Sequence, residues 1–235
     1  MQEKTDCLSC SKSDCFIKLC TDDWKSKINR RKTVCTYPKN QYIFKAGTPV
    51  MGAYFICQGK VKVVSEDIDG NEQTVRLAGN CHMFGHVAVK TETYPISALT
   101  MDESTICFIE NVVLQEAYME NNPFTFHSMV FYARELRKLE ERLKCLSLMS
   151  TEKKVIATLR YIADTFGYLD ESSTIAVRLT RKEIADLAGT NIEQVSRIIS
   201  SFKSKNWVQH EQKWITLLNI PALNAEIASF FPVKE

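Results

Sequence analysis

The chain has 235 residues, enough for one large domain or two of ordinary size. Hydrophobic residues make up 45% and charged residues 25%, as in soluble globular proteins, and a net charge of +2 indicates neither a nucleic-acid nor a membrane partner. The N-terminus lacks the apolar core and cleavage site of a signal peptide, and no apolar run approaches the ~18 residues of a membrane span. We therefore expect a cytoplasmic protein with no membrane partner.

Four of the nine cysteines fall within a short polar stretch near the N-terminus: Cys7, Cys10, Cys15 and Cys20. In the reducing cytoplasm such a cluster favours metal binding or redox activity over disulfide bonds. The odd total also argues against a fully paired disulfide framework. The residues alone leave two alternatives open, a metal site such as zinc bound by all four thiolates and a metal-free thiol switch.

A glycine-rich region follows this cluster. Six of the eight glycines lie between positions 47 and 85, where they separate short segments rich in β-branched and aromatic residues. These patterns predict strands at 53–57, 60–64, 73–77 and 104–110, with a hairpin turn at 67–72. Turn signals at intervals of about 8–12 residues predict a compact antiparallel barrel or sandwich.

After Pro123 the apolar residues alternate spacings of three and four, which is the pattern of a heptad seam. The stripe consists of Met129, Tyr132, Leu136, Leu139, Leu143 and Leu146. Because charged side chains fill the other faces, a dimerising coiled coil is favoured, with an amphipathic helix packed on its own domain as the alternative. The polar stretch 147–151 predicts a hinge.

The sharpest local motif is LTRKEIADLAGTNIEQVSRIISSFK at residues 179–203. Thr180 and Glu183 form a capping box that begins one helix, and Gly189 supplies the positive φ of a sharp turn. Asn191 and Gln194 repeat the capping arrangement at the start of a second helix. The side chains expected to face inward from this helix are Val195, Ile198, Ile199 and Phe202. The spacing predicts a helix-turn-helix.

The exposed face of the second helix carries Glu193, Ser196 and Arg197. Arginine suits guanine, glutamate the amino group of cytosine, and serine either base. Residues 178–205 hold six basic and three acidic side chains, a local net charge of +3 that favours phosphate contacts. The predicted DNA-binding set is completed by Thr180, Arg181, Asn191 and Gln194. The alternative is a structural helix pair without a DNA role.

Residues 207–218 predict a β-hairpin wing packed by Trp207 and Trp214. The order of the predicted parts resembles that of the CRP/FNR family of bacterial transcription regulators. These parts are a β-roll, a long dimerisation helix and a winged helix-turn-helix. The resemblance runs from about Thr33 to Pro221. It is carried by FKAGTPVMGAYFICQGKVKV at 44–63, FGHVAVKTETYPISA at 84–98 and the E-x-x-S-R pattern of the second helix.

The resemblance implies an α+β fold that begins with an antiparallel, cyclic-nucleotide-binding-like β-roll. The expected parts are a Cys-rich segment at 1–32, the β-roll sensor at 33–122, the dimerisation helix at 123–150 and the winged helix-turn-helix domain at 151–235. It also implies a homodimer, contact with RNA polymerase, and a target in double-stranded DNA made of an inverted repeat of TTGA-like half-sites.

Family members that bind cyclic nucleotides hold the phosphate with an Arg–Ser pair and the ribose with a Glu directly after a Gly. In this chain Ile96 precedes Ser97, and His86 follows Gly85. Without the arginine, a buried phosphate would carry uncompensated charge. We therefore expect no cyclic AMP binding.

The FNR branch of the family binds an oxygen-labile [4Fe–4S] cluster with three N-terminal cysteines and a fourth on a late strand of the β-roll. By this resemblance Cys7, Cys10 and Cys15 are the first choice for the local ligands, Cys20 is a replacement for one of them, and Cys107 is the strand ligand. Thiolates are soft ligands that suit iron–sulfur clusters. The spacing here, C-x2-C-x4-C-x4-C, departs from the family's C-x2-C-x5-C, so zinc and a thiol switch remain alternatives.

The sequence CHMFGH offers a further possibility, because Cys81, His82 or His86 would suit haem iron inside the β-roll. The alternative is one surface histidine and one that makes a hydrogen bond in the core. The cysteines without clustering are expected to behave as small buried hydrophobes: Cys35, Cys57, Cys81 and Cys145.

These patterns together predict a DNA-binding regulator that responds to oxygen, nitric oxide or redox state. We expect no enzymatic activity, because the chain shows no nucleophile–base constellation and no phosphate-binding loop. A regulator that is constitutive or responds to a small molecule remains an alternative. A redox enzyme or electron carrier is a further one, although it would have no use for the E-x-x-S-R helix.

Overall fold

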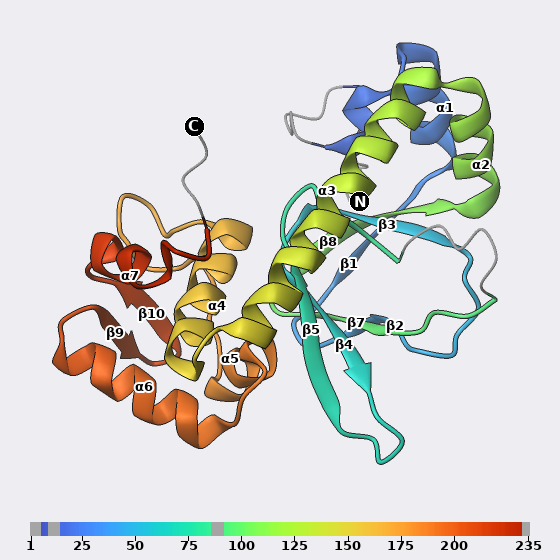
Figure 1. The fold of residues 1–235 in the computed structure, drawn as a ribbon. Helices are drawn as coiled ribbons and strands as arrows, with labels where there is room; N and C mark the ends of the chain where they lie inside the picture. The colour runs from blue at the N-terminus through green and yellow to red at the C-terminus, as the bar shows by residue number, and fades with distance from the viewer. Residues whose placement is uncertain (1–5, 9–14, 86–91, 232–235) are drawn as a thin grey trace. The chain divides into compact units, whose positions relative to one another are not determined.

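The computed structural model of the protein describes residues 6–8, 15–85 and 92–231 (Figure 1). The chain divides into two compact units, one made of residues 1–72 with 76–136 and the other of residues 73–75 with 137–235. Within the described ranges, no helix combines the length and apolarity that crossing a bilayer requires.

The first unit contains two four-stranded antiparallel sheets, with strand orders β1-β8-β3-β6 and β2-β7-β4-β5. The strands are β1 (Thr33–Tyr37), β2 (Tyr42–Phe44), β3 (Gly52–Gln58), β4 (Val61–Glu66), β5 (Glu72–Ala78), β6 (Met83–Phe84), β7 (Ser97–Thr100) and β8 (Ser104–Glu110). Val61, Val63, Ala98 and Ile106 are each at most 1% exposed. Apolar residues at alternate strand positions thus form a core, as the predicted β-roll requires.

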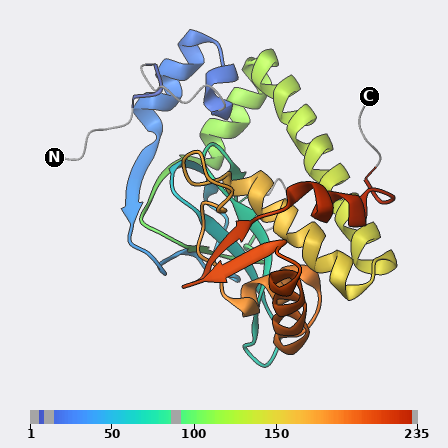
Figure 2. The ribbon, with the colours of Figure 1, turned by 90° about the vertical axis from the view of Figure 1, so that its left-hand side faces the viewer.

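Helices cover one end of this unit. They are the 3-10 helix η1 (Phe16–Leu19), α1 (Asp22–Arg31), α2 (Asn111–Glu120) and α3 (Asn122–Leu148). In both views α1 lies beside α2 and the start of α3 (Figures 1 and 2). Trp24 and Ile28, one turn apart on α1, are buried in the same apolar cluster as Val113 and Ala117 of α2. Helix α1, which follows the N-terminal cysteines in the sequence, is therefore packed onto α2.

The second unit is the predicted winged helix-turn-helix. Its elements are α4 (Thr151–Phe166), α5 (Arg181–Ala188), α6 (Ile192–Ser204), β9 (Val208–Glu211), β10 (Trp214–Leu217) and α7 (Ile220–Ile227). Ser150 caps α4 by accepting a hydrogen bond from the backbone N–H of Lys153. β9 and β10 pair as an antiparallel hairpin, and the Trp207 ring packs 5.8 Å from the Phe202 ring of α6.

Candidate functional sites

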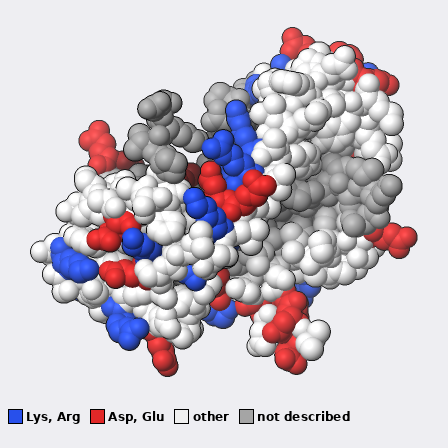
Figure 3. All heavy atoms as spheres, viewed as in Figure 1, with Lys and Arg blue, Asp and Glu red and all other residues white. Residues whose placement is uncertain are grey.

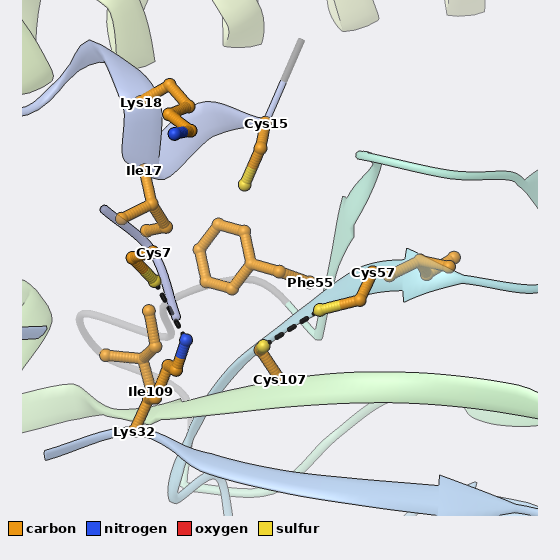
Figure 4. A pocket seen from close by; sticks show the side chains of 10 residues that line it. Cys7, Cys15, Ile17, Lys18, Lys32, Phe55, Cys57, Cys107 and Ile109 are labelled. Atoms are coloured by element: carbon orange, nitrogen blue, oxygen red, sulfur yellow. Dashed lines mark hydrogen bonds between the residues drawn. The ribbon is translucent and has the colours of Figure 1, made fainter. Parts of the chain in front are cut away.

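Cysteines from distant parts of the sequence meet at one cavity in the first unit (Figure 4). The cavity has a volume of about 30 Å³ and is lined by Cys7, Cys15, Ile17, Lys18, Lys32, Phe55, Ile56, Cys57, Cys107 and Ile109. Cys20 is buried in the neighbouring apolar cluster but does not line the cavity. Cys10 lies outside the described residues. The structure therefore brings Cys7 and Cys15 to the strand cysteine Cys107.

The pairing of β3 with β8 places a second strand cysteine at this cavity. Phe55 is the register partner of Cys107, and a bulge between Ile56 and Gln58 inserts Cys57 as an extra residue. The Cys57 and Cys107 sulfur atoms are only 2.9 Å apart. The bulge thus accompanies a close approach of the two thiols.

A buried lysine completes the polar part of the site. Lys32 is 5% exposed, and its Nζ donates a hydrogen bond to the sulfur of Cys7 at 2.9 Å. The backbone N–H of Cys7 donates to Oδ1 of Asn29 on α1, which holds this cysteine in place. Buried lysines require a partner, and here the partner is a thiol. The site therefore combines soft sulfur donors with a buried positive charge.

The Lys32 ammonium keeps its charge in this setting. Burial by itself would lower the pKa of Lys32, but the hydrogen bond to Cys7 and the charges of Cys7, Cys107 and Cys57 outweigh it and raise the pKa above its ordinary value. A lysine that is protonated at neutral pH favours negative charge on the sulfur atoms around it.

Three of the thiols in and beside this cavity have raised pKa values, which favours their protonated form. Burial raises the pKa of Cys15 to about 11 and that of Cys20 to about 12. The hydrogen bond with Cys57, followed by burial, raises the pKa of Cys107. Binding of a metal would displace these protons, so metal affinity at this site should increase with pH.

Sulfur donors dominate the polar lining of this cavity. In the part of the chain that the structure describes, no three Cys, His, Asp or Glu side chains are grouped to hold one metal ion. A [4Fe–4S] cluster instead takes four cysteine thiolates, and the cavity presents three of the predicted ligands, Cys7, Cys15 and Cys107. A volume of about 30 Å³ holds little more than a water molecule, so a cluster does not fit the cavity in this conformation.

Replacing Lys32 with methionine separates its electrostatic role from its packing role. We expect metal-free protein to keep or gain resistance to urea, because methionine fills the space without a buried charge. If the cavity binds iron, we expect its affinity for iron to fall about 10–100-fold, as for loss of other groups that support metal ligands, so that a chelator removes the iron more readily. Lys18→Met is the matched control, because Lys18 lines the same cavity but donates to the Leu8 carbonyl. Equal iron release from both variants would contradict this role of Lys32.

The residues considered for haem have local structural roles where they are described. Nδ1 of His82 accepts a hydrogen bond from the backbone N–H of Gly79 at 3.2 Å, within the turn between β5 and β6. Cys81 occupies a positive-φ position in the same turn, at +66°. His86 lies outside the described residues. The hydrogen bond of His82 matches the alternative to haem ligation more closely than haem ligation itself.

Aromatic side chains fill the β-roll interior near the predicted cassette. The ring of Phe44 stacks on Tyr94 with a centroid separation of 4.0 Å, and on Tyr54 at 5.2 Å. Phe84 stacks on Tyr54 at 5.4 Å. Ser97 is 3% exposed, and its Oγ accepts from the backbone N–H of Ala46. The serine that would meet a cyclic phosphate is thus engaged with the protein backbone.

The unclustered cysteines differ from one another more than expected. Cys145 is buried, as predicted. Cys35 is exposed on β1, so the expectation of burial is wrong for this residue. Its strand lies at the edge of the sheet, where side chains on one face meet solvent. Cys57 and Cys81 are half-buried.

The predicted dimerisation stripe on α3 is largely uncovered. Side-chain exposure there ranges from 37% for Tyr132 to 65% for Met129, and Leu136, Leu139 and Leu143 lie between these values. Leu146 is half-buried. An amphipathic helix packed on its own domain would bury this stripe, so the exposure favours an intermolecular partner.

The helix-turn-helix has the predicted local geometry. Thr180 and Glu183 form the reciprocal capping box of α5, and Gly189 ends the helix in the left-handed region at φ +60° and ψ +47°. Asn191 caps α6 by accepting from the backbone N–H of Gln194 at 2.9 Å. The side chains buried on α6 are the predicted Val195, Ile198, Ile199 and Phe202.

The opposite face of α6 presents the candidate base-reading residues. Glu193 and Arg197 are exposed and Ser196 is half-buried, and their spacing places all three on one face of the helix. Thr180 and Asn191 are engaged as helix caps. Gln194 accepts a hydrogen bond from the Thr190 hydroxyl.

Charge is mixed on the face of this unit that Figure 3 shows. On the face shown in Figure 3, basic and acidic side chains are interspersed over the C-terminal unit. Lys182, for example, pairs with Asp186 on the same helix at 3.1 Å.

Comparison with known proteins agrees with both units. The family model of the cyclic nucleotide-binding domain matches residues 34–121, and that of the Crp-like helix-turn-helix domain matches residues 153–226. The anaerobic regulatory protein of Bacillus subtilis is 22% identical over 185 residues, 77% of either chain. The CRP-like cAMP-activated global transcriptional regulator of Mycobacterium tuberculosis is 26% identical over 184 residues, 77% of this chain and 82% of that protein.

The fold is shared with solved regulators. FixK2 from Bradyrhizobium japonicum superposes with a TM-score of 0.73 at 20% identity, covering 83% of this chain and 96% of that one. These relatives and this fold are those of transcription regulators and not of enzymes. The protein belongs to the CRP/FNR family of DNA-binding transcription regulators.

Proposed function

We propose that this regulator responds to oxygen, nitric oxide or redox state through an iron–sulfur cluster bound by Cys107 and N-terminal cysteines. The observation that carries the proposal is the meeting of Cys7 and Cys15 with Cys107 at one cavity beside a buried lysine. The name of the Bacillus subtilis relative, an anaerobic regulatory protein, points the same way. Cys10 and Cys20 are the candidates for a further ligand.

When bound, such a cluster supplies iron that reacts with oxygen or nitric oxide. The protein's own residues determine what that reaction changes. Cys107 is fixed on β8, which pairs with both β1 and β3, whereas Cys7 and Cys15 belong to the segment before α1. If Cys107 and the N-terminal cysteines bind the same cluster, they tie this segment to the sheet. Loss of the cluster would free the segment.

The segment contacts the dimerisation helix directly. Phe16, the residue after Cys15, packs edge-on against Phe124 and Phe131 of α3, with ring centroids 5.4 and 5.5 Å away. Phe16 and Phe124 are both buried. Displacement of Cys15 therefore moves an aromatic side chain that positions α3, which bears the exposed apolar stripe.

The readout follows from the helix-turn-helix. Two chains joined along the α3 stripe would place two α6 helices about one DNA turn apart, ~34 Å, on an inverted repeat. The E-x-x-S-R pattern supports TTGA-like half-sites, and the family resemblance supports RNA polymerase as a further partner. The proposed parts are a sensor at 33–122, a dimerisation helix at 123–150 and a DNA-binding domain at 151–235.

Cyclic AMP is not the effector in this proposal. The aromatic stack of Phe44, Tyr54 and Tyr94 fills the β-roll interior, and Ser97 is bonded to the backbone. A phosphate buried there would have no arginine from the Ile96 position to pair with.

The proposal is tested by measuring binding to an inverted TTGA repeat. Fluorescence anisotropy is recorded without oxygen and again after air is admitted. We expect affinity to fall at least tenfold in air for the wild type. In Phe16→Ala we expect iron to bind but the effect of air to be lost, because the contact with α3 is removed. Phe16→Leu, which keeps the apolar volume, should retain more of the response. An unchanged affinity of iron-loaded wild type in air would contradict the proposal.

A further inference from the structure

Cys57, which the iron–sulfur proposal does not use, lies beside Cys107, the strand ligand of that proposal. Their sulfur atoms are 2.9 Å apart on the neighbouring strands β3 and β8 (Figure 4). A disulfide bond has an S–S length of about 2.05 Å, so a further approach of about 0.9 Å is enough to form one. Both thiols line the same cavity as Cys7 and Lys32.

The two strands hold this pair together, with Cys107 fixed and the backbone at Cys57 less constrained. β8 is hydrogen-bonded on both sides, to β1 and to β3, which fixes Cys107. Cys57 is the extra residue of a bulge, where the ladder is interrupted and the backbone is less constrained. Cys57 is also half-buried, whereas Cys107 is 6% exposed. A small reagent that enters the cavity therefore meets Cys57 first.

We propose that Cys57 and Cys107 are a redox-active dithiol that a hydroperoxide closes into an intramolecular disulfide. The Cys57 sulfur attacks the terminal oxygen of the peroxide, the O–O bond breaks, and the leaving oxygen takes a proton to become an alcohol, or water from hydrogen peroxide. Cys57 is then a sulfenic acid. The Cys107 sulfur attacks the Cys57 sulfur, the S–S bond forms, and hydroxide leaves with the Cys107 proton as water.

This reaction balances without any other reactant. The two thiols lose two electrons and two protons, and the hydroperoxide gains them as it becomes alcohol and water. The Lys32 ammonium at the same cavity stabilises the negative charge that passes from the Cys57 sulfur to the leaving oxygen during attack. The reducing cytoplasm would reverse the reaction by thiol–disulfide exchange.

The disulfide forms independently of the proposed function, but its regulatory consequence rests on that function. A disulfide consumes Cys107, which is the proposed strand ligand, so oxidised protein could not bind iron through this residue. Peroxide would in this way block cluster assembly until the pair is reduced. Loss of the metal alone would then be repaired by adding iron and sulfide. Repair after oxidation of the thiols would also require a reductant.

The sequence makes the pair easy to detect. Trypsin would release Cys57 in peptide 46–60 and Cys107 in peptide 91–134. The other cysteines fall in different peptides, with only Cys7 and Cys10 sharing one. A Cys57–Cys107 disulfide therefore joins two peptides that no other cysteine pair would join.

The test uses the full chain, freed of metal, treated with hydrogen peroxide, alkylated, digested without reductant and analysed by mass spectrometry. We expect peptides 46–60 and 91–134 to be joined as the dominant cross-link and to separate on reduction. Cys57→Ser should abolish the cross-link, and Cys35→Ser, also a strand cysteine, should retain it. Recovery of both peptides unjoined and alkylated, or joining of 91–134 mainly to an N-terminal peptide, would overturn the proposal.

A parallel reconstitution with iron and sulfide separates this inference from the proposed function. Protein that forms the cross-link but never binds iron would uphold the dithiol and reject the cluster. Protein that binds iron but forms no cross-link would uphold the cluster and reject the dithiol. If both hold, peroxide-treated protein should take up iron only after reduction.

Discussion

Replacing Arg197 with alanine is expected to remove most of the protein's preference for its specific DNA site while leaving the fold intact. Arg197 is exposed on α6, on the face opposite the buried Val195 and Ile199, so its truncation opens no cavity. A bidentate contact from arginine to guanine contributes about 1–3 kcal/mol of discrimination. A dimer on an inverted repeat uses two such contacts, so the expected loss is about 2–6 kcal/mol.

The measurement is fluorescence anisotropy on an inverted TTGA repeat and on a shuffled duplex over a range of salt concentrations. Lys203→Ala is the matched control, because Lys203 is an exposed basic residue in the last turn of the same helix. A lysine that contacts only phosphate should weaken binding to both duplexes alike. If Arg197→Ala also weakens binding to both duplexes equally, Arg197 does not read a base.

Cys107→Ser is expected to abolish iron binding. Cys107 is the candidate ligand from the β-roll sheet, and a serine hydroxyl is a much harder and less acidic donor than a thiol. We expect protein reconstituted with iron and sulfide without oxygen to fall from about four irons per chain to nearly none. Because Cys107 is buried, the fold must be checked by circular dichroism in the same samples.

Cys145→Ser provides the control for this experiment. Cys145 is 9% exposed and Cys107 is 6% exposed, so the two substitutions bury a hydroxyl to a similar degree. Cys145 does not line the cavity, so its replacement should leave iron content unchanged. Equal iron content in the two variants would remove Cys107 from the site.

Features set by local sequence were predictable. The capping box of Thr180 and Glu183 and the positive φ of Gly189 depend on residues three or four positions apart, and the structure contains both. Strands such as 104–110 were predictable because apolar and β-branched residues mark them directly. The short strands β2 and β6 were not, because two or three residues carry too little pattern to distinguish a strand from a loop.

The helix α1 was missed for a related reason. Its sequence, DDWKSKINRR, is polar apart from Trp24 and Ile28, and two buried residues are a weak helical signal. Its burial depends on α2, more than eighty residues later in the chain. Sequence periodicity reports which face of a helix is apolar but not which distant element will cover it.

Part of the sulfur site followed from family resemblance alone. Nothing in local spacing joins Cys107 to Cys7, and the structure adds Lys32 and Cys57, neither of which sequence analysis assigned to a site. Lysine side chains are ordinarily exposed, so nothing in the sequence indicated that Lys32 is buried. Alternation along β3 places Cys57 on the same face as Phe55, but its approach to Cys107 involves a bulge that the sequence does not mark.

The central claim is that the cysteine-lined cavity binds an oxygen-sensitive iron–sulfur cluster. The most direct test is an absorption spectrum of protein purified without oxygen, with iron and sulfide assays, repeated after air is admitted. We predict a broad shoulder near ~400 nm that bleaches in air, with about four iron and four sulfide per chain. A featureless spectrum without iron would contradict the cluster and leave zinc or a thiol switch, and a sharp Soret band would instead place haem near His82 or His86.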